Sequence, residues 1–171
     1  MNSVNPDLRR LALLTPRQLM TPRTLPLMRA MSRLEWRRTP KHVEVLTLAS
    51  GAGVRLYRPP ELSGAAMVWI HGGGYVAGRT FLDDAQCRRF VRELGITVAS
   101  VEYRLAPEHP YPAGLEDCYS VVTWLTGLPA VDPARVAIGG ASAGGGLAAA
   151  LALLARDRGE VAPALQVLLY P

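Results

Sequence analysis

The stretch RVAIGGASAGGGLAAALALLARDR, residues 135–158, predicts the centre of the fold. Its first apolar residues, 136–138, are typical of a short buried strand, and leucines further on repeat along one helix face, at Leu147, Leu151 and Leu154. Between them lies GASAG, residues 140–144, which fits the G-x-S-x-G pattern of a serine held on a sharp strand-to-helix turn. Such a turn takes disfavoured backbone angles, and small neighbours let it close. We therefore expect Ser142 at the apex, facing the N–H groups that begin the helix.

A second glycine-rich motif follows an earlier apolar run. HGGG, residues 71–74, comes directly after MVWI, residues 67–70, and matches a loop that supplies backbone N–H groups to an oxyanion. Alone, GASAG is also compatible with an ordinary tight turn, because the chain is rich in glycine and alanine. The two motifs together favour a site for acyl transfer with Ser142 as nucleophile.

Three segments resemble one protein family. HGGGYVAG (residues 71–78), YRLAPEHPYPA (103–113) and GGASAGGG (139–146), in this order, closely resemble the hormone-sensitive-lipase-like group of α/β-hydrolase carboxylesterases. The resemblance extends from about residue 41 to residue 171. It implies the hydrolysis of carboxylic esters with small or medium acyl groups through a seryl acyl-enzyme, with no metal and no cofactor.

The resemblance also implies a role for individual residues. Ser142 is the nucleophile, and the backbone amides of Gly73, Gly74 and Ala143 receive the oxyanion. Ala141 departs from the family, which more often has aspartate there, and we expect only a tuning effect because that position is not part of the catalytic triad.

Alternating apolar and helical segments predict an α/β fold. Residues 42–49 and 54–57 form a hairpin of half-exposed edge strands, separated by a glycine-containing turn. Buried strands and helices alternate after it, with strands at 65–70, 96–101, 136–138 and 165–170 and helices at 83–94, 115–125 and 143–158. We expect an α/β-hydrolase sheet, mostly parallel with an antiparallel N-terminal hairpin and helices on both faces, truncated after the strand that follows the nucleophile helix. Residues 1–40 form an N-terminal helical cap and residues 41–171 an incomplete core.

A catalytic base is missing from the expected place. In the family the acid and the histidine follow the strand that here ends in Pro171, whereas His42, His71 and His109 all precede Ser142. His42 is expected on an outer strand and His71 in the oxyanion loop. We therefore expect the chain to be inactive or strongly impaired as an esterase.

Some acidic and histidine residues have two interpretations. Glu108 and His109 form either an acid–base pair or part of a structural loop, and the resemblance favours the loop. Asp157 and Glu160 flank a helix end far from the strand tips that carry active sites. The alternative to an esterase is an inactive fragment or interaction module that pairs through its exposed strand from Leu165 to Tyr170, with a second copy or with a C-terminal complement.

Composition excludes several other functions. The formal net charge is +5, with eight arginines in the first forty residues, but no interleaved aromatic residues suggest nucleic-acid binding. Cys87 and Cys118 fall in expected helices and indicate buried free thiols in a reducing cytoplasm. The longest apolar run, residues 141–155, is too short to span a membrane. A loose G-x-G-x-x-A at 144–149 lies inside a helix and does not support nucleotide binding. The expected partner is a small-molecule ester.

Overall fold

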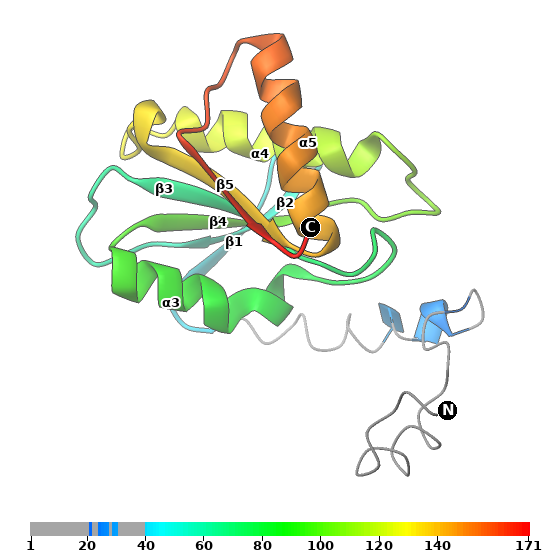
Figure 1. The fold of residues 1–171 in the computed structure, drawn as a ribbon. Coiled ribbons are helices and arrows are strands. Elements are labelled where there is room, and N and C mark those ends of the chain that lie inside the picture. The colour runs from blue at the N-terminus through cyan, green and yellow to red at the C-terminus, as the bar shows by residue number, and fades with distance from the viewer. Residues whose placement is uncertain (1–20, 22–23, 28, 31–39) are drawn as a thin grey trace, which may run out of the picture.

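The computed structural model describes residues 21, 24–27, 29–30 and 40–171, which centre on a six-stranded sheet (Figure 1). In spatial order its strands are β1 (Val43–Thr47), β2 (Gly53–Tyr57), β4 (Thr97–Glu102), β3 (Ala66–Ile70), β5 (Val136–Ala141) and β6 (Leu165–Leu169). The β1–β2 and β2–β4 pairs are antiparallel, and the other pairs are parallel. This confirms the predicted mostly parallel sheet with an antiparallel N-terminal hairpin.

Helices cover both faces of this sheet, as predicted (Figure 1). The helical elements are η2 (Thr80–Asp83), α3 (Asp84–Leu94), α4 (Ala113–Thr126), η3 (Pro133–Arg135) and α5 (Ala143–Arg158). Alternate residues of β3 point to opposite faces. Val68 packs in the cluster that includes α4 and α5, whereas Trp69 packs in the cluster that includes α3.

Each face of the sheet contains one free cysteine. Cys87 lies in the cluster beneath α3 and Cys118 in the cluster beneath α4, and both are fully buried. Burial raises the pKa of both thiols well above its usual range. The prediction of two buried free thiols is confirmed.

The position predicted for β2 is wrong. This strand is not an edge, because it pairs with β1 on one side and β4 on the other, and Val54 and Leu56 are fully buried. A charged residue such as Arg55, which lies between them, is typical of a half-exposed strand. Its guanidinium is buried because it forms an ion pair with Asp84, at 2.9 Å between Nη2 and Oδ2.

The predicted N-terminal cap lies mostly outside the described residues. Within residues 1–40, the described residues 25–27 and 29–30 are helical. Arg29, from this part, reaches the loops at the carboxyl ends of the parallel strands. Among the described residues, every helix is too short or too polar to cross a membrane.

Candidate active site

Ser142 occupies a strained turn between β5 and α5. Its backbone angles are φ 53° and ψ −123°, in a region that side-chain-bearing residues rarely adopt, and its side chain is exposed. Two glycines allow the turn. A Cβ on Gly140 would lie 2.6 Å from the carbonyl oxygen of Ile70, and one on Gly144 would lie 2.6 Å from that of His71. The two glycines of GASAG are therefore required by close contact with the end of β3 and with the residue that follows it.

The loop after β3 packs against this turn. Gly73 and Gly74 have positive φ angles of 125° and 62°, and the N–H groups of Val76 and Ala77 donate to the Gly73 carbonyl at 3.2 and 2.9 Å. A Cβ on Gly72 would lie 3.4 Å from that of Ser142, so the two motifs are in contact. Within the described residues, the N–H groups of Gly73 and Gly74 donate to no other group.

A cleft of about 380 Å³ opens beside Ser142 and Gly73. Gly74 and Ala143, the other two residues expected at the site, are not part of its lining. Ala143 is the first residue of α5, where helical N–H groups have no partner within the helix. Two of the four expected site residues therefore share the cleft, and the other two are their immediate neighbours.

Four lining residues of the cleft were missed in the sequence. These are Arg29, Leu82, Asp83 and Tyr170. Asp83 is held by the indole of Trp69, whose Nε1 donates to Oδ2 at 2.8 Å. No local pattern connects these positions to the two glycine-rich motifs, so only the fold brings them together.

His71 is the one histidine of the three that lines the cleft, and it is part of the scaffold. Its ring stacks on Tyr103, with 4.3 Å between centroids, and its Nδ1 lies 2.7 Å from the carbonyl oxygen of Gly72. Because a carbonyl only accepts, the neutral ring donates there. Burial lowers the pKa of His71 below its usual 6.5.

This burial predicts a loss of stability in mild acid. Below pH 6.5 the unfolded chain binds a proton at His71 that the folded chain excludes, so the free energy of unfolding should fall as pH falls, by up to about 1.4 kcal/mol per pH unit. Urea unfolding between pH 7 and 5 measures it. In the His71→Gln variant the dependence over this range should be weaker, and an identical dependence would contradict the assignment.

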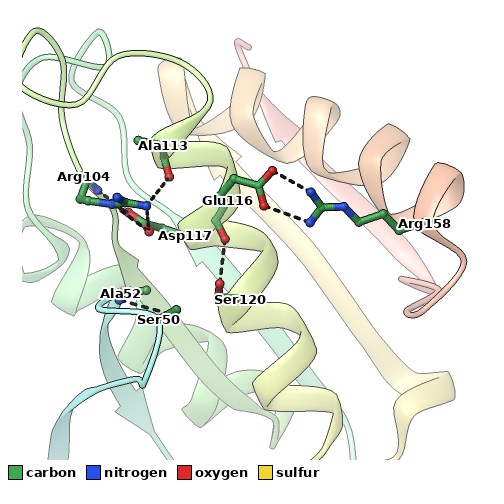
Figure 2. A network of polar contacts seen from close by, with 8 residues as sticks. All are labelled: Ser50, Ala52, Arg104, Ala113, Glu116, Asp117, Ser120 and Arg158. Atoms are coloured by element: carbon green, nitrogen blue, oxygen red, sulfur yellow. Dashed lines mark hydrogen bonds and ion pairs between the residues drawn. The ribbon is translucent and has the colours of Figure 1, made fainter.

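Glu108 and His109 lie in a loop that is fixed by ion pairs. At its start, Arg104 contacts Asp117 of α4, at 2.8 Å between Nη2 and Oδ1 (Figure 2). Glu108 pairs with Arg29 at 2.6 Å, and His109 donates its backbone N–H to the carbonyl of Leu105 at 3.0 Å. The carboxylate of Glu108 is therefore engaged by Arg29, as the structural interpretation of this loop requires.

The other polar candidates lie away from the cleft. His42 is an exposed residue just before β1, and Glu160 accepts a hydrogen bond from Tyr119 at 2.8 Å beyond the C-terminal end of α5. In the described part of the chain, no three His, Cys, Asp or Glu side chains come together as metal ligands would.

A serine on a strained strand-to-helix turn, beside a glycine-rich loop at the tips of a mostly parallel sheet, is typical of α/β hydrolases. The chain belongs to the family described as alpha/beta hydrolase fold, which matches residues 67–171. The resemblance to hormone-sensitive-lipase-like carboxylesterases is confirmed.

Several relatives of the chain carry esterase names. The chain is 44% identical over 145 residues to carboxylic ester hydrolase LipN of Mycobacterium tuberculosis, covering 76% of this chain and 38% of LipN. It is 42% identical over 126 residues to ethyl acetate hydrolase of Pseudomonas putida, covering 69% and 40%. The hyperthermophilic esterase of Pyrobaculum calidifontis matches with a TM-score of 0.78 at 37% identity, over 98% of this chain and 59% of that one. The chain thus spans less than two thirds of each relative.

Proposed function

We propose that this chain carries the nucleophile and the oxyanion donors of a carboxylic ester hydrolase. The observation that carries the proposal is the contact between the strained turn at Ser142 and the glycine-rich loop, whose Gly73 and Gly74 amides donate to no other described group. The esterase names of its relatives support it.

The proposed reaction passes through a seryl acyl-enzyme. The Ser142 oxygen attacks the ester carbonyl carbon and loses its proton to a base, and the carbonyl oxygen becomes an oxyanion held by the amides of Gly73, Gly74 and Ala143. The C–O bond to the alcohol then breaks, the alcohol takes the proton, and water releases the acid in a second cycle of the same kind.

We further propose that none of the three histidines of the chain acts as this base. The His71 ring is buried against Tyr103, and His42 and His109 do not line the cleft with Ser142. On this proposal the triad acid and base are missing from the chain, which alone should be strongly impaired as an esterase.

Labelling with a fluorophosphonate probe tests the nucleophile. The probe should modify Ser142, slowly because no base assists, and peptide mapping by mass spectrometry identifies the site. The Ser142→Ala variant is the control. Labelling of another serine at the same rate, or none at saturating probe, would contradict the proposal.

The strand β6 favours a second candidate function, association through the sheet edge. Among the described strands it pairs only with β5, and Leu165 and Tyr170 are 59% and 76% exposed. An unpaired apolar edge is a template for another strand. Light scattering after size-exclusion chromatography tests this: a dimer that Val167→Pro converts to monomer would support it, whereas a monomer at all concentrations would oppose it.

The proposal also includes a substrate class and a cellular location for the chain. Its expected partner is a small-molecule ester, and the two free cysteines support a reducing cytoplasm as its location.

A further inference from the structure

Arg29 contacts both loops at the mouth of the cleft. Its Nε donates to the carbonyl oxygen of Val76 at 2.8 Å, in the loop after β3. Its Nη2 donates to the carbonyl oxygen of Ala106 at 2.5 Å, and its Nη1 to both carboxylate oxygens of Glu108, at 2.6 and 2.7 Å, in the loop after β4. One guanidinium group therefore joins two loops that are far apart in the sequence.

The Val76 carbonyl belongs to the turn that holds the proposed oxyanion donors. The N–H of Val76 donates to the carbonyl of Gly73 and so closes the turn. The carbonyl of the same residue accepts from Arg29. The same two loops share a backbone bond, from the N–H of Ala106 to the carbonyl of Tyr75 at 3.0 Å. A displacement of the Val76 backbone would therefore also displace the backbone of Gly73 and Gly74.

The chemistry of arginine suits this contact. A planar guanidinium donates in several fixed directions at once, whereas a lysine ammonium is a compact point charge on a flexible stem. Arg29 is only 17% exposed in its side chain, lines the cleft with Ser142, and lowers the pKa of Glu108, so that this carboxylate stays ionised as its partner.

We propose that Arg29 is a positioning residue for the oxyanion loop: its contacts with Val76, Ala106 and Glu108, here called the latch, hold the turn at 73–77 and fix the Gly73 and Gly74 amides. The catalytic consequence rests on the function proposed above, but the latch itself does not. Misplacing a catalytic group by about 1 Å can cost up to about 100-fold in rate, so a modest shift of these amides has a measurable effect.

Hydrogen exchange tests the latch without any need for activity. In the 171-residue chain, Arg29→Met should raise amide exchange in the peptide covering residues 71–78 about tenfold, because the hydrogen bonds to the Gly73 carbonyl open more often. Glu108→Gln keeps the Val76 and Ala106 bonds and should raise it less. It is also the second variant if Arg29→Met does not fold.

A matched control comes from another arginine–glutamate pair. Glu116 accepts from Arg158 at 2.7 and 3.0 Å, between α4 and the end of α5 (Figure 2), so Glu116→Gln removes a similar pair away from the loop. It should leave exchange at 71–78 unchanged. Equal exchange there in Arg29→Met and the parent would overturn the latch. A rise that is equally large in the peptides of β3, β4 and β5 would also overturn it, because that pattern reports global loss of stability.

The probe reaction at Ser142 gives the catalytic readout. Arg29→Met should lower the maximal rate of fluorophosphonate modification about tenfold and leave the probe concentration at half-maximal rate nearly unchanged, since the oxyanion donors act on the transition state. An unchanged maximal rate in a parent that is labelled would overturn the positioning role. No labelling of the parent would overturn the proposed function, while hydrogen exchange still decides the latch.

Discussion

The purified 171-residue chain should hydrolyse p-nitrophenyl acetate on the order of 10⁶-fold more slowly than a serine esterase with a complete triad. If no residue of the chain acts as the base, as proposed, the Ser142 hydroxyl is a weak nucleophile, and only the proposed oxyanion donors and substrate binding assist the reaction. These still give roughly 10³- to 10⁴-fold over the reaction in water, so a small signal should persist. Initial rates measured beside the Pyrobaculum calidifontis esterase test this.

The Ser142→Ala variant separates this signal from background. If the residual activity passes through the proposed acyl-enzyme, the substitution lowers it; if it comes from the oxyanion donors and substrate binding alone, with water attacking the ester directly, the substitution leaves it unchanged. Turnover close to that of the comparison esterase, and lost in Ser142→Ala, would contradict the proposed absence of a base. It would show that His109 or a second copy of the chain completes the site.

Gly144→Ala should have the largest effect on stability. The new Cβ would lie 2.6 Å from the carbonyl oxygen of His71 and would also collide with that of Ile70, both backbone atoms that a rotamer change cannot move. We expect the free energy of unfolding to fall by about 3 kcal/mol, at the upper end of overpacking effects, and the labelling of Ser142 to be lost. Urea unfolding and the fluorophosphonate assay measure the two effects.

Gly127→Ala is the matched control for this substitution. Gly127 has a φ angle of −84°, and a Cβ there would meet its nearest atom, the Trp124 carbonyl oxygen, at an ordinary 3.5 Å. Its effect on the free energy of unfolding should stay within about 0.5 kcal/mol. Equal effects at the two glycines would show that the contact between the turn and β3 does not limit stability.

Most of the fold could be predicted because short apolar runs alternate with segments of helical periodicity, and glycine or proline marks many of the turns between them. The position of β2 could not be, because Arg55 looks like a solvent-facing residue until its partner Asp84, from α3, is known. Burial of an arginine depends on a contact between distant segments, which no local period encodes.

The same distinction holds for the site: residues in local motifs could be predicted, and residues from distant segments could not. Ser142 and Gly73 lie in motifs whose spacing is set by a single turn each, so their neighbourhood could be inferred from the residues around them. Arg29, Asp83 and Tyr170 line the same cleft from three separate parts of the chain. Arg29 is one of eight arginines in the first forty residues, and no local pattern distinguishes it from the others, yet it is bound to two loops of the core.

The two cysteines provide built-in reporters of local opening. Cys87 and Cys118 are sealed on opposite sides of the sheet, and the raised pKa of each thiol keeps it protonated and unreactive while its side stays closed. A maleimide therefore modifies Cys87 only when the α3 layer lifts and Cys118 only when the α4 layer lifts. The relative modification rates compare how often each layer detaches, in one sample and without any introduced label.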